Sequence, residues 1–213
     1  MNDSSSSLFI VSAPSGAGKT SLLRELLQRD KQLSLSVSHT TRAMRPGEQD
    51  GVDYHFADKH AFMQLVGEGA FIEHAQVFDN FYGTSEMAVR EQLEAGLDVV
   101  VEIDWQGARQ VRQRFPGAVS IFIIPPSIQA LRERLSGRGQ DSEDIIERRM
   151  RDAQAELSHY GEYDYLIVND DFQLALQQLG EVVAAERLRE VRQQVRHLAV
   201  LREMLAPPSA NGS

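Results

Sequence analysis

The sequence contains no cysteine among its 213 residues. This absence excludes disulfide bonds, thiolate metal sites and cysteine nucleophiles. It agrees with a cytoplasmic location, which we expect for this protein. No run of about 18 apolar residues occurs, so we predict no membrane-spanning helix and no membrane partner. The opening residues, MNDSSSS, lack the basic and apolar regions of a signal peptide, so none is expected.

Positive charge is also scarce, since 22 lysines and arginines face 31 acidic residues and give a formal net charge of −9. An acidic chain is poorly suited to nonspecific nucleic-acid binding, and we expect no nucleic-acid partner. The six histidines form no pair at a helical metal-ligand spacing, so a histidine metal site is not expected. Hydrophobic residues make up 42%, which is ordinary for a globular protein.

Apolar runs of strand length recur along the chain and alternate with helical patterns. The five runs are Leu8–Ser12, Leu33–Ser38, Asp98–Asp104, Val119–Pro126 and Asp164–Asp170. Continuous apolar strands separated by helices are typical of a parallel sheet that is covered on both faces. The sequence therefore predicts an α/β fold with a parallel sheet flanked by helices.

Two segments differ from this core in residue composition and are interpreted as insertions. Residues 37–87 are rich in glycine, polar and aromatic residues, with one helix near Lys59–Gly67, and residues 127–159 are helical and arginine-rich. The predicted core then consists of residues 8–36, 88–126 and 160–206, and residues 1–7 and 207–213 are predicted to be flexible tails.

Residues 172–205 show leucines and valines at helical spacing and predict a long amphipathic helix or a helix pair, with a break at Gly180. This helix can pack on the core or on a second subunit, so a homo-oligomer is one of two open alternatives.

A glycine-rich stretch, APSGAGKT, follows the first strand and opens the first helix. It consists of Ala13, Pro14, Ser15, Gly16, Ala17, Gly18, Lys19 and Thr20. Except for Ala13 at the first glycine position, it matches the phosphate-binding P-loop pattern G-x-x-x-x-G-K-[ST]. Backbone N–H groups and the helix dipole would hold phosphates, which predicts ATP binding through these eight residues. Lys19 would reach the terminal phosphates, and the Thr20 hydroxyl would ligate Mg²⁺.

Two carboxylates, Glu102 and Asp104, end the run VVVEID on one side of the predicted strand. Ligands bind at strand ends in such sheets, so these groups could hold a metal through water or accept hydrogen bonds from a substrate. An acidic strand end that faces solvent is the alternative. The guanine-specificity loop N-K-x-D of GTPases is absent from the sequence, and the stretch VNDD at Val168–Asp171 does not match it. A GTPase is therefore not expected.

The stretch SVSHTTRAMRPGEQDGVDYHF places Arg42 and Arg45 close together in this acidic chain. Phosphoryl transfer to a nucleoside monophosphate requires a second phosphate clamp, separate from the P-loop. Guanidinium groups bind phosphate oxygens in a bidentate way, and Tyr54 and Tyr82 can add hydroxyl donors. The arginine pair is therefore a candidate clamp for an acceptor phosphate.

Several separated motifs now resemble one family. SHTTRAMRPGE, FIEHAQVFDNFYGTS, EIDWQG, GRGQDSE and YDYLIVNDD, in this order, are similar to bacterial guanylate kinases over residues 8–205. The resemblance implies a P-loop NTPase core, a GMP-binding insertion over 37–87 and a mobile lid over 127–159. It also implies transfer of the γ-phosphoryl group of ATP to GMP or dGMP with Mg²⁺.

Carried over residue by residue, the resemblance also implies a set of site residues. The GMP-contacting positions are Ser38, Arg42, Arg45, Tyr54, Glu73, Tyr82, Thr84 and Asp104. The catalytic positions are Lys19, Arg42 and the two lid arginines Arg138 and Arg149. Thr84 stands where some members have Ser, and Glu102 stands where many have Asp.

Chemistry favours guanine independently of the resemblance. Guanine offers N1–H and an exocyclic NH₂ as donors, which one carboxylate such as Glu73 can accept together, while a hydroxyl such as Ser38 can donate to O6. Adenine offers the opposite pattern and would leave buried groups unpaired, which can discriminate on the order of 10⁴-fold.

Two other functions are alternatives for this sequence. The first is a P-loop phosphotransferase that acts on another small phosphate ester, which a substrate panel would reveal. The second is a binding module that has lost catalysis, but Lys19, Thr20, Arg138 and Arg149 are all present. Arg132 and Arg151 are interpreted as part of a solvated helical face.

Overall fold

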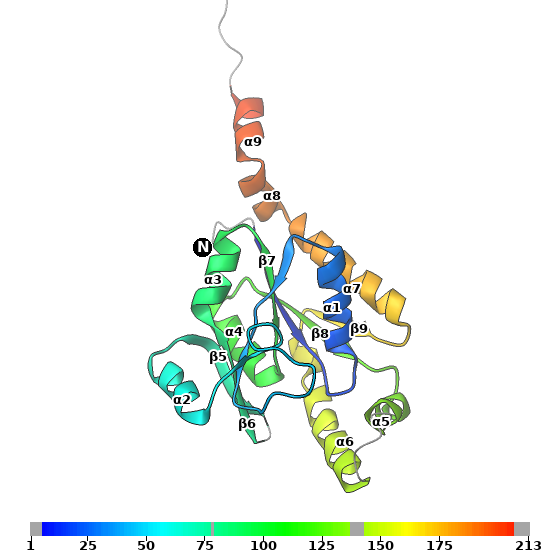
Figure 1. The fold of residues 1–213 in the computed structure, drawn as a ribbon. Coiled ribbons are helices and arrows are strands. Elements are labelled where there is room, and N and C mark those ends of the chain that lie inside the picture. Colours follow the sequence, from blue (N-terminus) through cyan, green and yellow to red (C-terminus); the bar gives the residue numbers. More distant parts are fainter. Residues whose placement is uncertain (1–5, 78, 137–142, 207–213) are drawn as a thin grey trace, which may run out of the picture.

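The computed structural model describes residues 6–77, 79–136 and 143–206, which form two sheets surrounded by helices (Figure 1). The core sheet has the strand order β2-β7-β1-β8-β9. These strands are β1 (Leu8–Ser12), β2 (Leu33–Leu35), β7 (Asp98–Glu102), β8 (Val119–Ile124) and β9 (Tyr165–Val168). Every neighbouring pair is parallel, which confirms the predicted α/β fold with a parallel sheet.

The five predicted strands all exist, and β1 has the predicted bounds. The other four are shorter than predicted, because the predicted ranges include flanking residues, most of them polar or proline, that lie outside the strands. β8 ends at Ile124, before Pro125, which has no N–H to donate to a ladder. β7 ends at Glu102, so Asp104 lies beyond the strand, and the prediction of both carboxylates on one strand is wrong in this respect.

Helices cover both faces of the core sheet, as the continuous apolar strands require. On one face, Phe9 and Val11 of β1 pack against α1 (Lys19–Arg29) and α7 (Phe172–Arg187). On the other face, Leu8 and Ile10 pack against α3 (Glu86–Glu94) and α4 (Trp105–Arg114). Alternate residues of one strand therefore hold the two layers together.

The second sheet has the order β4-β3-β6-β5 and follows β2 in the chain. Its elements are β3 (His39–Thr40), β4 (His55–Phe56), α2 (Lys59–Gly67), β5 (Phe71–Val77) and β6 (Asn80–Ser85), and the helix predicted at Lys59–Gly67 is confirmed. Phe62 of α2 stacks on Phe71, with ring centroids 4.9 Å apart. A Cβ at Gly83 would lie 3.1 Å from both rings, so close packing at this position of β6 favours glycine.

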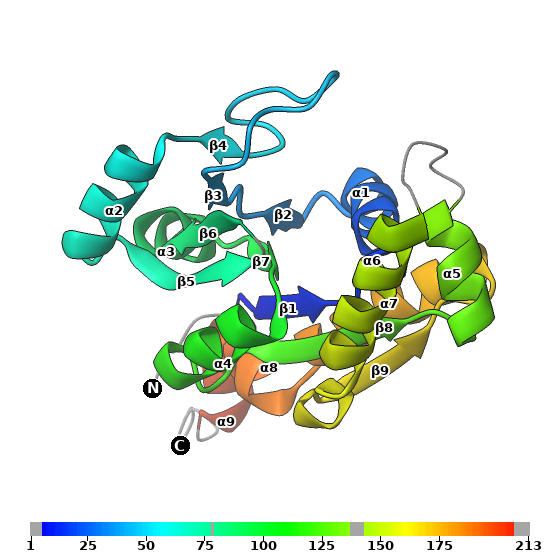
Figure 2. The same cartoon turned by 90° about the horizontal axis from the view of Figure 1, so that it is seen from below.

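The helices α5 (Ile128–Ser136) and α6 (Glu143–Leu157) form an apolar cluster of their own. Leu131 and Leu135 of α5 pack there against Ile146 and Met150 of α6. Figure 2 shows this pair on one side of the molecule and the four-stranded sheet with α2 on the other.

The C-terminal segment corrects one prediction, since α7 continues through Gly180. A Cβ there would lie 3.6 Å from Leu26 of α1, so this residue is on the packed face of the helix. The break comes at Leu188 and Arg189, and α8 (Glu190–Arg196) and α9 (Leu198–Leu205) then extend away from the sheet (Figure 1).

A buried ion cluster joins the end of α7 to the start of β7. Arg187 donates from Nε to Asp98 Oδ2 and from Nη1 to Asp30 Oδ2, each at 2.6 Å. Asp98 also accepts the Ser7 N–H through Oδ1, and its side chain is only 7% exposed. The cluster thus ties together the N-terminal ends of β1 and β7 and the C-terminal ends of α1 and α7.

We predict that Arg187→Met lowers the free energy of unfolding by about 3 kcal/mol, because it leaves Asp98 buried without its counter-ion. Urea unfolding measures this value. Arg29→Met is the matched control, because Arg29 pairs with Glu25 at a largely exposed position and its loss should cost less than about 0.5 kcal/mol. Equal losses in the two variants would contradict a stabilising role for the buried cluster.

Candidate active site

One cavity of about 420 Å³ lies at the carboxyl edge of the core sheet. Both sheets, α1 and the α5–α6 pair contribute to its wall. The lining residues are Ala13, Pro14, Ser15, Gly16, Gly18, Lys19, Thr20, Ser21, Ser38, Tyr54, Glu73, Ala75, Val77, Tyr82, Glu102, Ile103, Asp104, Arg134 and Glu156. The structure thus brings the predicted phosphate loop and most of the predicted acceptor-site residues to one place.

The phosphate loop connects β1 to α1, and a hydrogen bond from Asn169, next to β9, fixes its position. Gly16 and Gly18 have φ values of 89° and 93°, which favour glycine, and the Asn169 amide donates to the Ala17 carbonyl at 2.7 Å. A Cβ at Gly18 would lie 2.4 Å from that amide nitrogen. Asn169, which sequence reasoning missed, therefore fixes the loop from the end of β9.

The N-terminus of α1 opens into the cavity without a side-chain cap, because its N-cap residue is Gly18. Free N–H groups and the helix dipole make such an end a binding site for anions. Lys19 Nζ lies 3.8 Å from Glu102 Oε1, and the Thr20 hydroxyl donates to the same oxygen at 2.6 Å. A cationic donor, a hydroxyl and a carboxylate are therefore grouped beside the loop.

Asp104 is the N-cap of α4 and accepts the Gly107 N–H at 2.9 Å. Its other oxygen accepts from the Gln106 side chain at 3.0 Å. These two bonds fix the Asp104 carboxylate on the cavity wall next to the end of β7. Because Gly107 has no side chain, it also leaves room for the Glu73 carboxyl. A Cβ at Gly107 would lie 2.5 Å from Glu73 Oε2.

Glu73 is a buried carboxyl in the cavity wall, with 2% of its surface exposed. The Thr84 hydroxyl, directly across from it on β6, donates to Oε1 at 2.6 Å, and the Ser38 hydroxyl lies 3.4 Å from the Thr84 hydroxyl. Burial raises the pKa of Glu73 to about 7, against the lowering effect of the Thr84 hydrogen bond. The three predicted residues form one polar cluster that can recognise donors and acceptors.

Tyr54 and Tyr82 line the cavity with ring centroids 6.0 Å apart. Arg42 stands behind Tyr54, with its guanidinium carbon 5.4 Å from the ring centroid, and donates to Glu48 at 2.7 Å. This hydrogen bond raises the pKa of Arg42. Glu48, which sequence reasoning missed, also accepts the backbone N–H of Arg45, whose own side chain is exposed.

The α5–α6 pair contributes two residues that sequence reasoning did not select for the site. Arg134 lines the cavity and donates to the Asn169 carbonyl at 2.9 Å, and Glu156 accepts the Ser15 N–H at 3.2 Å. Arg149 is half-buried on α6 and is not among the lining residues of the described chain. Arg138 lies outside the described residues. Arg132 forms exposed ion pairs with acidic residues of α6, as expected of a solvated face.

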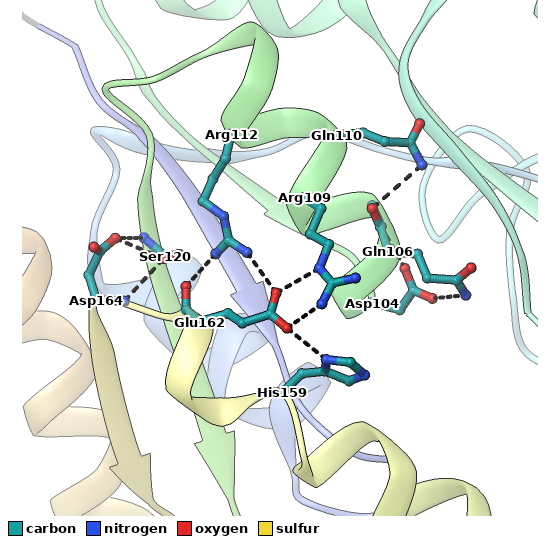
Figure 3. A network of polar contacts seen from close by, with 10 residues as sticks. Asp104, Gln106, Arg109, Gln110, Arg112, Ser120, His159, Glu162 and Asp164 are labelled. Carbon is teal, nitrogen blue, oxygen red and sulfur yellow. Dashed lines mark hydrogen bonds and ion pairs between the residues drawn. The ribbon is translucent and has the colours of Figure 1, made fainter.

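A polar network lies next to Asp104 and connects α4 with the short helix η1 (Tyr160–Glu162), as Figure 3 shows. Glu162 of η1 accepts hydrogen bonds from Arg109 and His159, and the Arg109 bond lowers the pKa of Glu162 to about 2. His159 stacks on Trp105, the first residue of α4, at 3.9 Å between ring centroids. The network therefore joins the end of α6 to the helix that Asp104 caps.

The described residues contain no cluster of three or more histidines or carboxylates that could hold a metal ion by themselves. Within the same residues, no helix is long and apolar enough to cross a membrane.

Comparison with known proteins gives consistent matches. A model of the guanylate kinase family matches residues 5–186. The chain is 57% identical to a guanylate kinase of Alkalilimnicola ehrlichii and 59% identical to one of Chromohalobacter salexigens, covering 93% and 95% of this chain and 98% and 94% of those proteins. A crystal structure of guanylate kinase from Anaplasma phagocytophilum aligns with a TM-score of 0.75 at 33% identity and covers 92% of this chain and 95% of its own.

The buried Glu73 carboxyl generates a prediction about stability and pH. Its pKa of about 7 in the folded protein exceeds the value of 4.5 in an unfolded chain, so the folded state holds the extra proton between these values. The free energy of unfolding should therefore fall as pH rises from 4.5 to 7, by about 3 kcal/mol more in the wild type than in Glu73→Gln. Urea unfolding at several pH values measures the difference.

The pKa of Glu156 is also raised, but this residue is present in both proteins, so its effect on the pH dependence of stability cancels in the comparison. Parallel pH curves for wild type and Glu73→Gln would contradict the raised pKa of Glu73.

Proposed function

The chain belongs to the guanylate kinase family, and on that premise we propose how its cavity transfers a phosphoryl group from ATP to GMP. Guanylate kinases phosphorylate GMP with ATP, and this chain is such a kinase. One observation supports the assignment of the two nucleotide sites: the phosphate loop and the Glu73 cluster line the same cavity. ATP occupies the loop, and GMP occupies the four-stranded sheet opposite to it.

The donor half of the proposal uses residues 13–20. The uncapped end of α1 and the left-handed turns at Gly16 and Gly18 direct backbone N–H groups to the phosphates of ATP. Lys19 neutralises charge on the transferring phosphoryl group. A preorganised charged donor in a water-excluded site lowers the barrier because it stabilises charge that develops in the transition state.

The acceptor half assigns the guanine base to the Glu73 cluster. The Glu73 carboxylate accepts N1–H and the exocyclic NH₂, and Ser38 with Thr84 supplies hydroxyl groups for O6 and for Glu73 itself. Asp104 faces the same space from the N-cap of α4. Burial makes the selection strict, because a base with the opposite donor pattern would leave these groups unpaired.

The GMP phosphate is assigned to Tyr54, Tyr82, Arg42 and Arg45. Both tyrosines line the cavity, and Glu48 holds Arg42 directly behind Tyr54. Arg45 belongs to the same turn, and its exposed side chain can fold over a bound phosphate. The dianion of GMP would recruit the Arg42 fork by offering a second partner beside Glu48.

Phosphoryl transfer by guanylate kinases generally needs a divalent metal, and we assign Mg²⁺ to Thr20. Mg²⁺ takes oxygen ligands and binds through few protein groups together with nucleotide phosphates, which fits one hydroxyl beside Glu102. The metal, when bound, neutralises phosphate charge. Glu102 orients the Thr20 hydroxyl by accepting its hydrogen bond at 2.6 Å.

We assign the remaining parts by the same premise. Residues 8–36, 88–126 and 160–206 form the core, residues 37–87 the GMP-binding insertion, and residues 127–159 a lid that brings Arg138 and Arg149 toward the transferring group. Lid closure would exclude water from the reaction. We also predict a cytoplasmic location.

Self-association of the chain is favoured by exposed apolar residues near its C-terminal end. These residues are Leu188, which follows α7, Val191 of α8 and Leu205 of α9.

We predict that Lys19→Ala lowers kcat at least about 10²-fold, since it removes a preorganised cation from the transferring phosphate. A coupled assay that detects ADP formation with ATP and GMP measures the effect. Lys31→Ala is the matched control, because Lys31 is exposed on the loop after α1. Near-normal turnover of Lys19→Ala would remove the argument for the phosphate loop.

Substitutions in the Glu73 cluster and in the proposed phosphate clamp should change the kinetics in different ways. Glu73→Gln replaces one acceptor with a donor that faces guanine, so kcat/KM for GMP should fall strongly and the GMP/AMP ratio should narrow. Arg42→Ala should weaken GMP and AMP alike, because both carry the same dianion, and should keep the ratio. Steady-state rates with the two nucleotides measure both ratios.

Glu91→Gln, at an exposed position of α3, controls for the change of charge. If Glu73→Gln keeps the full GMP/AMP ratio, this residue does not recognise the base.

A further inference from the structure

A carboxyl group of α6 reaches into the phosphate loop. Glu156 lines the cavity, and its Oε2 accepts the backbone N–H of Ser15 at 3.2 Å. Ser15 is the third residue of the loop and lines the same cavity. Glu156 therefore places a negatively charged oxygen on a donor that belongs to the phosphate site.

A carboxylate resembles a phosphate in the property that this loop recognises, because both are anions that accept hydrogen bonds from backbone N–H groups. One N–H cannot donate well to both. When ATP enters the loop, its terminal phosphates and the Glu156 carboxylate compete for this donor and repel each other. The contact thus opposes ATP binding while Glu156 is ionised.

The charged groups around Glu156 in the described chain come from several elements. Lys19 of α1 favours its ionised form, whereas Asp104 at the start of α4 and Asp152 on α6 itself oppose it. Arg134 of α5 and Glu102 of β7 line the same cavity. Burial outweighs the attraction of Lys19 and raises the pKa of Glu156 to about 7. Both protonation states are therefore populated at neutral pH.

We propose that Glu156 sets the affinity of the phosphate loop for ATP, because its carboxylate occupies the Ser15 N–H until it is protonated or displaced. The proposal rests on the assignment of ATP to residues 13–20. In the protonated form the group carries no charge and its hydroxyl can donate to a phosphate oxygen. In the ionised form it acts as an internal competitor of ATP.

The sign of the pH effect follows directly. Below about pH 7 Glu156 is protonated in the folded protein and permits ATP binding, and above this value the carboxylate opposes it. The dissociation constant of ATP should therefore rise as pH increases through this range. Glu156→Gln keeps the shape and the acceptor oxygen but stays neutral, so it imitates the protonated form at every pH.

The test measures ATP binding by isothermal titration calorimetry from pH 6 to pH 8.5, with Mg²⁺ and without GMP, on the full chain. Between the two limits, the dissociation constant of the wild type should rise about tenfold more than that of Glu156→Gln. Ionisation of ATP itself is common to all proteins and cancels in this comparison. Asp144→Asn removes a charge from an exposed position on the same helix and should follow the wild type.

Glu156→Ala provides a second variant, which removes both the charge and the hydrogen bond and should also lose the pH dependence. The proposal is overturned if the wild type and both variants show parallel pH curves, or if both variants bind ATP more weakly at every pH, which would make Glu156 a structural anchor. Phosphorylation of GMP by the wild type is measured separately. If it is absent, the assigned function fails, whereas the comparison of ATP binding still decides the role of Glu156.

Discussion

The common direction of the five core strands determines where the chemistry of this protein takes place. Because β1, β7 and β9 end at one edge, the phosphate loop, Glu102 and Asn169 meet there although they are far apart in the sequence. Asn169 then holds the loop through the Ala17 carbonyl. The four-stranded sheet and the α5–α6 pair leave the core after β2 and β8, at the same edge, so each brings polar groups over the loop.

The parts of this arrangement that the sequence predicts are those with local signals. Apolar runs predict the core strands, and the glycines and Lys19 predict the phosphate loop. Pairs between distant segments have no such signal, and this is why Asn169 and Glu156 were missed. The break predicted at Gly180 was wrong because packing against α1 outweighs the weak helix propensity of glycine. The sequence predicts Asp104 within a strand, because the apolar run does not indicate where the ladder ends.

The charge of the cavity explains why proton binding matters for its function. Its described lining contains four carboxyl groups, Glu73, Glu102, Asp104 and Glu156, but only Lys19 and Arg134 as cations. Two anionic nucleotides cannot enter such a space together unless part of this negative charge is neutralised. Burial of Glu73 and Glu156 does so in part, because it favours their protonated forms. The helix dipole at α1 and a divalent metal supply positive charge where the carboxyl groups do not.

The two buried carboxyls respond to their ligands in opposite ways. On the proposed assignments, guanine brings two N–H donors to Glu73, which stabilise the carboxylate and lower its pKa, so GMP binding releases a proton near neutral pH. ATP brings negative charge to Glu156, which raises its pKa further, so ATP binding takes up a proton. The two proton changes therefore have opposite signs. The opposite responses arise from one physical cause, the burial of a carboxyl at each substrate, combined with the different chemistry of a base edge and a phosphate.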